Sequence, residues 1–222
     1  MFRQDRTNPS TAVSNWKGRK DTARGWPSTA VSTWLNGGLF GAVIDEDFQA
    51  ILSTLVGSDS SSVTLTSAGS SAAWTEFQDL LLISQVKSAH DGIHRGVFAK
   101  LNANASNYSN QNLYVVGTHG SMSAGTERED LAGARIDYAA GSASGVDADY
   151  YGCAITTFGD INSGRYKTVQ TMGGVDVNGS GAVGQCVTTW RDTAVVTSIE
   201  IVDSGGSNII AGSRFDLYGL RV

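Results

Sequence analysis

The chain has 222 residues, a length that suits one ordinary domain with an appendage. Hydrophobic residues make up 41% and charged residues 17%, with 27 glycines and 2 prolines, which favours many short strands joined by turns over a helical protein. The net charge is −5, but the first forty residues hold six basic and two acidic side chains, a net of +4 that leaves −9 elsewhere. These basic residues are too few and scattered to predict nucleic-acid binding, and no apolar stretch approaches the ~20 residues of a membrane span.

Residues 1–43 form a basic arm with a duplicated motif. The octapeptide PSTAVSNW at 9–16 returns as PSTAVSTW at 27–34, with seven of eight residues identical, which chance hardly produces. The arm holds three of the five tryptophans, Trp16, Trp26 and Trp34. Tryptophan dominates binding hot spots, so we interpret the arm as an anchor that docks on a partner protein. The alternatives are a duplication without function and a tryptophan pair that folds back on the body.

The segment 44–57 has helical periodicity. Its apolar residues recur at i, i+3, i+4, i+7 and i+8, and Asp45 and Gly57 suit a helix start and stop. We therefore predict a short amphipathic helix over 45–56 that forms a neck. Such a helix can pack on the body or on copies of itself around a symmetry axis. The predicted interface residues are Phe48, Ile51, Leu52 and Leu55.

From residue 58 to 222 the pattern is that of strands. Turn signals separate runs that alternate with period 2, and no helix intervenes, so we predict an all-β fold, an antiparallel jelly-roll-like β-sandwich. We predict a long loop with one poor strand over 119–149. The predicted strands are 62–66, 77–86, 95–101, 111–117, 150–158, 166–172, 183–191, 194–202 and 213–221. Cys153 and Cys186 fall within strands, where reduced, buried thiols are favoured over a disulfide.

The sequence predicts no catalytic residue, no cofactor and no metal. The glycine pattern of residues 179–184 precedes a strand-like run, whereas a nucleotide site needs a helix there, so a turn is favoured over a phosphate site. The overlapping segment Asp176–Gly181 likewise favours a hairpin turn over a cation site. The three histidines lack zinc-ligand spacing. Tyr108, Tyr138 and Tyr150 are candidates for a shallow carbohydrate-binding platform, although most aromatic residues in strands belong to the core.

Several segments are similar to a known family. They are SSVTLTS (61–67), WTEFQDLLLIS (74–84), KLNANASNYSN (100–110), WRDTAVVTSIEIV (190–202) and GSRFDLYGL (212–220). Together they resemble a C-terminal β-sandwich of virion structural proteins from tailed bacteriophages, of which the closing Phe-x-Leu-Tyr-Gly is the most specific part. The resemblance covers about residues 58–222 and leaves out the arm. It implies a tail, fibre or other surface protein of the particle, and it implies no catalytic residue. Phage appendages are commonly homotrimers and a neck helix suits such an assembly, so the resemblance also implies a homotrimer.

The function that we expect is therefore that of a virion structural protein without enzymatic activity. The arm attaches it to other virion proteins, and the sandwich faces outward as part of a tail fibre, tip or adaptor that binds host surface polysaccharide. A capsid decoration (cement) protein and a glycan-cleaving depolymerase are the alternatives. A secreted lectin is disfavoured because the first residues, MFRQDRTNPS, lack the apolar core of a signal peptide, which predicts synthesis in the host cytoplasm. The resemblance implies that the protein then becomes part of the virion.

If the duplicated motif is the anchor, replacing both Trp16 and Trp34 by Ala removes its two apolar contacts, and we expect the protein to be lost from assembled particles. The measurement is the amount of the variant that sediments with purified particles. Circular dichroism should show an unchanged sandwich. Normal incorporation of the double variant would show that the repeat does not anchor the protein.

Overall fold

The chain divides into two units, Met1–Phe48 and Gln49–Val222. The computed structural model describes residues 48–118, 121–125, 129–142 and 146–221. The arm of residues 1–43, with Trp16, Trp26 and Trp34, lies outside the described residues. Within the described part, no helix has the length and apolar character needed to cross a membrane.

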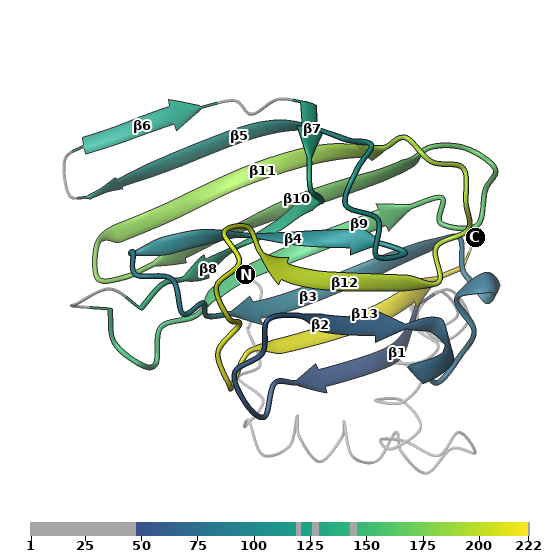
Figure 1. Cartoon of the computed structure of the whole chain (residues 1–222), viewed down its shortest axis with the longest axis horizontal. Helices are drawn as coiled ribbons and strands as arrows, with labels where there is room; N and C mark the ends of the chain where they lie inside the picture. The colour runs from purple at the N-terminus through teal and green to yellow at the C-terminus, as the bar shows by residue number, and fades with distance from the viewer. Residues whose placement is uncertain (1–47, 119–120, 126–128, 143–145, 222) are drawn as a thin grey trace, which may run out of the picture. The chain divides into compact units, whose positions relative to one another are not determined.

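The second unit is a sandwich of two antiparallel sheets, which confirms the predicted all-β fold and antiparallel β-sandwich (Figure 1). The larger sheet has the order β1-β13-β3-β9-β10-β11-β5-β6, with β7 also paired to β5. Its strands are β1 (Phe48–Leu55), β3 (Asp79–Val86), β5 (Tyr108–Thr118), β6 (Ser121–Gly125), β7 (Glu129–Leu131), β9 (Gly152–Gly159), β10 (Lys167–Asp176), β11 (Ser180–Trp190) and β13 (Arg214–Leu220). The smaller sheet has the order β2-β12-β4-β8, formed by β2 (Val63–Thr66), β12 (Ser198–Asp203), β4 (His94–Leu101) and β8 (Ala134–Ala140). Two 3-10 turns, Ser67–Gly69 and Trp74–Glu76, precede β3.

The core lies between the sheets and follows the alternation of the strands. In β12, Ile199 and Ile201 are fully buried, and in β13 Phe215 and Leu217 are fully buried. The side chains between them in sequence are only partly buried, as period-2 strands with one face inward require. Each such burial of a large apolar side chain contributes about 1.5–3 kcal/mol before the entropy of ordering is counted.

The predicted helix over 45–56 is wrong, because Phe48–Leu55 is the strand β1. β1 lies beside β13, and its end is fixed by the hydrogen bonds of Val56 N to Ser213 O (2.8 Å) and of Gly212 N to Val56 O (2.8 Å). A helix of this length is marginal by itself, so pairing with a distant strand outweighs local periodicity. The four residues that were predicted to form the helical interface are separated: Ile51 is buried, Phe48 and Leu52 are half-buried, and Leu55 is exposed.

The predicted long loop over 119–149 also contains more structure than expected. It holds β6, β7 and β8, and β8 is a buried strand of the smaller sheet, with Ala134, Ile136 and Ala139 fully buried. β8 lies so close to the larger sheet that a Cβ atom at Gly152 would overlap the carbonyl of Tyr138. Small side chains suit such a crossing, but their low hydrophobicity made this strand resemble a loop.

The hairpin predicted at Asp176–Gly181 is confirmed. Residues Val177 and Ser180 exchange backbone hydrogen bonds (2.7 and 3.3 Å), and Asn178 and Gly179 between them have φ angles of 53° and 85°. Two consecutive residues with positive φ define a type I′ turn, which matches the twist of β10 and β11 and favours Asn-Gly. The carboxylate of Asp176 accepts a hydrogen bond from Gly179 N (2.9 Å).

Both cysteines are reduced thiols, as predicted, but they differ in environment. Cys186 is buried in β11, whereas Cys153 is exposed in β9, so the expectation that both are buried is wrong for Cys153. The inward positions of β9 are taken instead by Gly152, Ala154 and Thr156, where small residues make room for β8.

The strand assignment of β1 leads to a test of stability. Replacing Ile51 by Ala leaves a cavity in the core and should lower the free energy of unfolding by about 2–4 kcal/mol. Leu55, with 68% of its surface exposed, should tolerate the same change within about 0.5 kcal/mol. Denaturant unfolding of the two variants gives both values. Equal losses at the two positions would contradict the strand and favour an apolar helical stripe.

Candidate functional site

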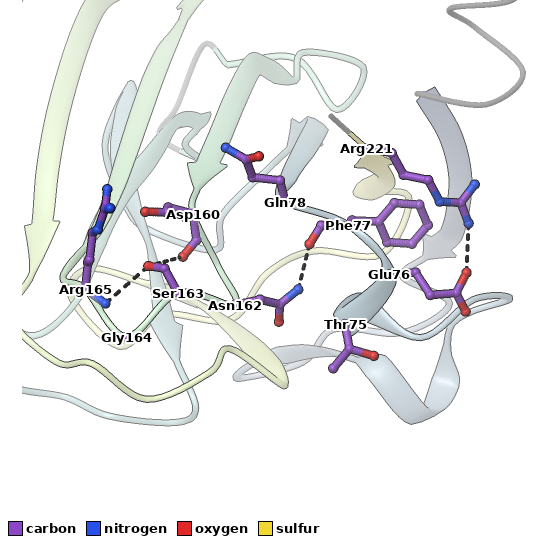
Figure 2. A pocket seen from close by; sticks show the side chains of 10 residues that line it. All are labelled: Thr75, Glu76, Phe77, Gln78, Asp160, Asn162, Ser163, Gly164, Arg165 and Arg221. Carbon is purple, nitrogen blue, oxygen red and sulfur yellow. Dashed lines mark hydrogen bonds and ion pairs between the residues drawn. The ribbon is translucent and has the colours of Figure 1, made fainter.

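A polar cleft lies beside the end of the sandwich where β13 ends and β3 begins (Figure 2). Three segments form it: the turn that precedes β3, the loop between β9 and β10, and the residue after β13. Its volume of about 790 Å³ falls within the range of small-molecule sites. The residues that line it are Thr75, Glu76, Phe77, Gln78, Asp160, Asn162, Ser163, Gly164, Arg165 and Arg221.

The side chain of Asn162 joins two of these segments. Its Nδ2 donates hydrogen bonds to the carbonyl oxygens of Trp74 (2.9 Å) and Phe77 (2.6 Å), as Figure 2 shows for Phe77. Ile161 N donates to Gln78 O (3.0 Å) beside it. The buried Asn162 Oδ1 has no hydrogen-bond partner among the described residues. The Asn162 side chain therefore links the segment before β3 to the loop after β9, while its own Oδ1 accepts no hydrogen bond from the described residues.

A buried lysine shapes the loop between β9 and β10. Lys167 is fully buried, and its Nζ donates to the carbonyl oxygens of Ser163 (2.5 Å) and Arg165 (2.6 Å). Desolvation lowers the pKa of this amine from its ordinary value. Because these carbonyls turn inward to Lys167, the exposed side chain of Arg165 is left at the rim, where its guanidinium has no ion-pair partner in the described part of the chain.

An ion pair stands on the opposite side of the cleft (Figure 2). Arg221 Nη2 donates to Glu76 Oε2 at 2.7 Å, and the guanidinium lies 4.7 Å from the centre of the Phe77 ring. Behind that ring, Gly219 leaves no room for a side chain, because a Cβ atom there would overlap Phe77. The stacked and paired guanidinium is more ordered than a free surface arginine.

These groups suit a neutral ligand with many hydroxyl groups. The cleft has two carboxylates, two guanidinium groups and two side-chain amides, so it contains both acceptors and donors and its formal charges balance. A hydroxyl group both donates and accepts, and charged partners make the stronger hydrogen bonds. A polyanion or a polycation would find half of the charged groups repulsive.

The tyrosines that were predicted as a carbohydrate platform do not form one. Tyr108 is fully buried and stacks on Trp190 with ring centres 6.2 Å apart, and burial raises the pKa of its hydroxyl, which accepts a hydrogen bond from Leu101 N (2.7 Å). Tyr138 is buried in a second, smaller core cluster, and the partly buried Tyr150 packs against that cluster. The structure thus places Tyr138 and Tyr150 in one region, but as core.

None of the cleft residues was predicted from the sequence to belong to a functional site. Its segments are 75–78, 160–165 and 221, and no local motif connects them. The register of the sheet brings them together, since Leu220 pairs with Asp79 and Phe158 pairs with Leu80. The turn signal Asn-Ser-Gly at 162–164 was visible, but nothing in it indicates that Asn162 spans two segments.

No group of three or more histidine, cysteine or carboxylate side chains in the described residues is arranged to hold a metal ion.

No family model and no curated protein matches this sequence. Among solved structures, the crystal structure of the Caenorhabditis elegans galectin LEC-6 is similar, with a TM-score of 0.28 and 11% sequence identity over 74% of this chain and 94% of the galectin. A likeness at this level carries no argument for function.

Asn162 provides a test of how the cleft is built. Asn162→Asp keeps the shape of the side chain but loses both donated hydrogen bonds and places a carboxylate against two carbonyl oxygens. We expect the free energy of unfolding to fall by about 2 kcal/mol or more. Hydrogen exchange should also become faster in residues 74–78 and 160–165. Unchanged stability and exchange would show that the two segments hold together without this amide.

Proposed function

We propose that this chain is a non-enzymatic structural subunit of a tailed-phage particle, most simply of a tail appendage, and that its sandwich binds a host surface glycan in the polar cleft. The resemblance to phage virion proteins supports the first part, and all its segments lie in strands or turns of the sandwich. Jelly-roll sandwiches serve in both viral capsid and lectin domains, so the fold is compatible with this role without defining it.

One observation carries the glycan proposal: carboxylate, amide and guanidinium groups from three separate segments converge on one cleft. Glu76 and Arg221 are held by their ion pair, and Asn162 by its two carbonyl partners, so these groups are ordered before any ligand arrives. Preorganised donors and acceptors lower the entropy cost of binding a polar ligand. The exposed guanidinium of Arg165 offers the ligand a set of hydrogen-bond donors.

A glycan-cleaving depolymerase is the second candidate, because the cleft contains two carboxylates. Hydrolases of glycosidic bonds use such a pair, one as the acid and the other as the base or nucleophile. Glu76, however, is held in an ion pair with the Arg221 guanidinium at 2.7 Å, so this carboxylate is engaged within the protein and is not directed at a substrate. The geometry therefore favours binding over cleavage.

The structure removes one reason to expect a homotrimer. The predicted homotrimer used a helix in the neck to pack three copies together. That segment is the strand β1, so it provides no helix for three-fold packing. A capsid decoration role remains the alternative to a tail appendage, and it predicts that the protein copurifies with heads free of tails.

The glycan proposal is tested with the full chain against a panel of bacterial O-antigen and capsular polysaccharides, by biolayer interferometry. Wild type should bind at least one polysaccharide saturably. Arg165→Ala and Glu76→Gln each remove a charged partner, so we expect binding to weaken by about 10- to 100-fold, as the loss of a charged hydrogen bond implies.

Arg214→Ala is the matched control, because Arg214 is an exposed arginine at the opposite end of β13 from Arg221, paired with Asp216 (2.7 Å). It should bind as wild type does. Equal binding by all variants, or no binding to any polysaccharide by a folded protein, contradicts the glycan site. Release of new reducing ends from a bound polysaccharide would instead identify a depolymerase.

A further inference from the structure

The larger sheet turns an unusually apolar row of side chains away from the core. Cross-strand pairing connects Ile83 in β3 to Ile155 in β9, Ile155 to Met172 in β10, Met172 to Gln185 in β11, and Gln185 to Leu113 in β5. The four apolar members are between 37% and 63% exposed. Exposed apolar residues that occur singly need no explanation, but a continuous row across five strands does.

The rows on either side extend this surface. One contains Leu81, Thr157, Gln170, Val187 and Gln111, and the other contains Gln85, Cys153, Gly174, Val183 and Val115. We call these fifteen positions the outer face. None of them is charged, although 17% of the chain is. Depletion of charge with exposed aliphatic residues and methionine is typical of the centre of a protein interface.

Four glutamines lie among the apolar residues of the outer face. They are Gln85, Gln111, Gln170 and Gln185, and each amide carries both donors and an acceptor. Such a group can pair with its own copy, whereas two equal charges could not. The face also has a shallow depression of about 280 Å³ beside Leu113 and Val187, which can receive an apolar side chain.

We propose that the outer face packs against the same face of a second copy of this chain, about a two-fold axis. An isologous contact needs a self-complementary surface, and an uncharged face with amide groups meets this need in a chain with a net charge of −5. Stacked sheets pack about 10 Å apart, a distance that aliphatic side chains from both faces fill.

The size of the face is adequate for such a contact. Five strands and three rows give a flat footprint of roughly 500 Å² from strand spacing and rise. Projecting side chains make the accessible area larger than the footprint, which brings it close to the ~800 Å² per partner of a specific interface. The polar cleft lies at the end of the sandwich, so both copies keep it accessible, and this proposal stands independently of glycan binding.

The test is the mass of the full chain in solution, by sedimentation velocity and light scattering. Wild type should have twice the mass of the 23.3-kDa chain. Met172→Glu places like charges in the middle of the desolvated contact, which should raise the dimer dissociation constant at least about 100-fold. Leu113→Glu, at another point of the face, guards against a local folding defect in Met172→Glu and should have the same effect.

Val195→Glu is the matched control, because Val195 is an exposed aliphatic residue in the loop between β11 and β12, outside the outer face. It should leave the dimer intact. The proposal is overturned if the wild-type chain stays monomeric at concentrations on the order of 100 µM. It is also overturned if both Met172→Glu and Leu113→Glu still form the dimer. A trimer dissociated by the variants also overturns it, because a two-fold contact cannot produce three equivalent copies.

Discussion

The insertion of β13 between β1 and β3 is the interaction on which the rest of the structure depends. This strand carries Phe215 and Leu217 into the core and is the neighbour of β1 in the larger sheet. It also places Gly219 beneath the Phe77 ring and leads directly into Arg221, where the guanidinium closes one side of the cleft. Core, edge strand and candidate site thus all depend on the seven residues of β13 and the arginine that follows them.

The strands β12 and β13 show why much of the fold could be predicted from the sequence. Alternation in residues such as Ile199, Ile201, Phe215 and Leu217 is a local signal, and burial on one face follows from it. The Asn178-Gly179 turn is equally local, because two residues with positive φ are expensive for most other side chains. These features need no knowledge of distant partners.

The failures arise where distant partners decide the outcome. Phe48–Leu55 has a helical pattern, but pairing with β13 makes it a strand and leaves Leu55 in solvent. β8 crosses Gly152 closely and three of its seven residues are alanines, so its burial leaves little hydrophobic signal. The cleft residues, among them Asn162 and Arg221, have ordinary local surroundings in sequence and meet only through the register of three strands.

The position of β13 also has a consequence for the order of events during synthesis. Ser53 in β1 donates a hydrogen bond to Asp216 in β13 across 163 residues of sequence, so ribosomes must translate nearly the whole sandwich before β1 finds its partner. Until then β3 presents an unpaired edge, which is a template for association with other nascent chains. Contacts of such high sequence separation slow folding, so the chain should gain most from a chaperone in the interval before its last described strand emerges.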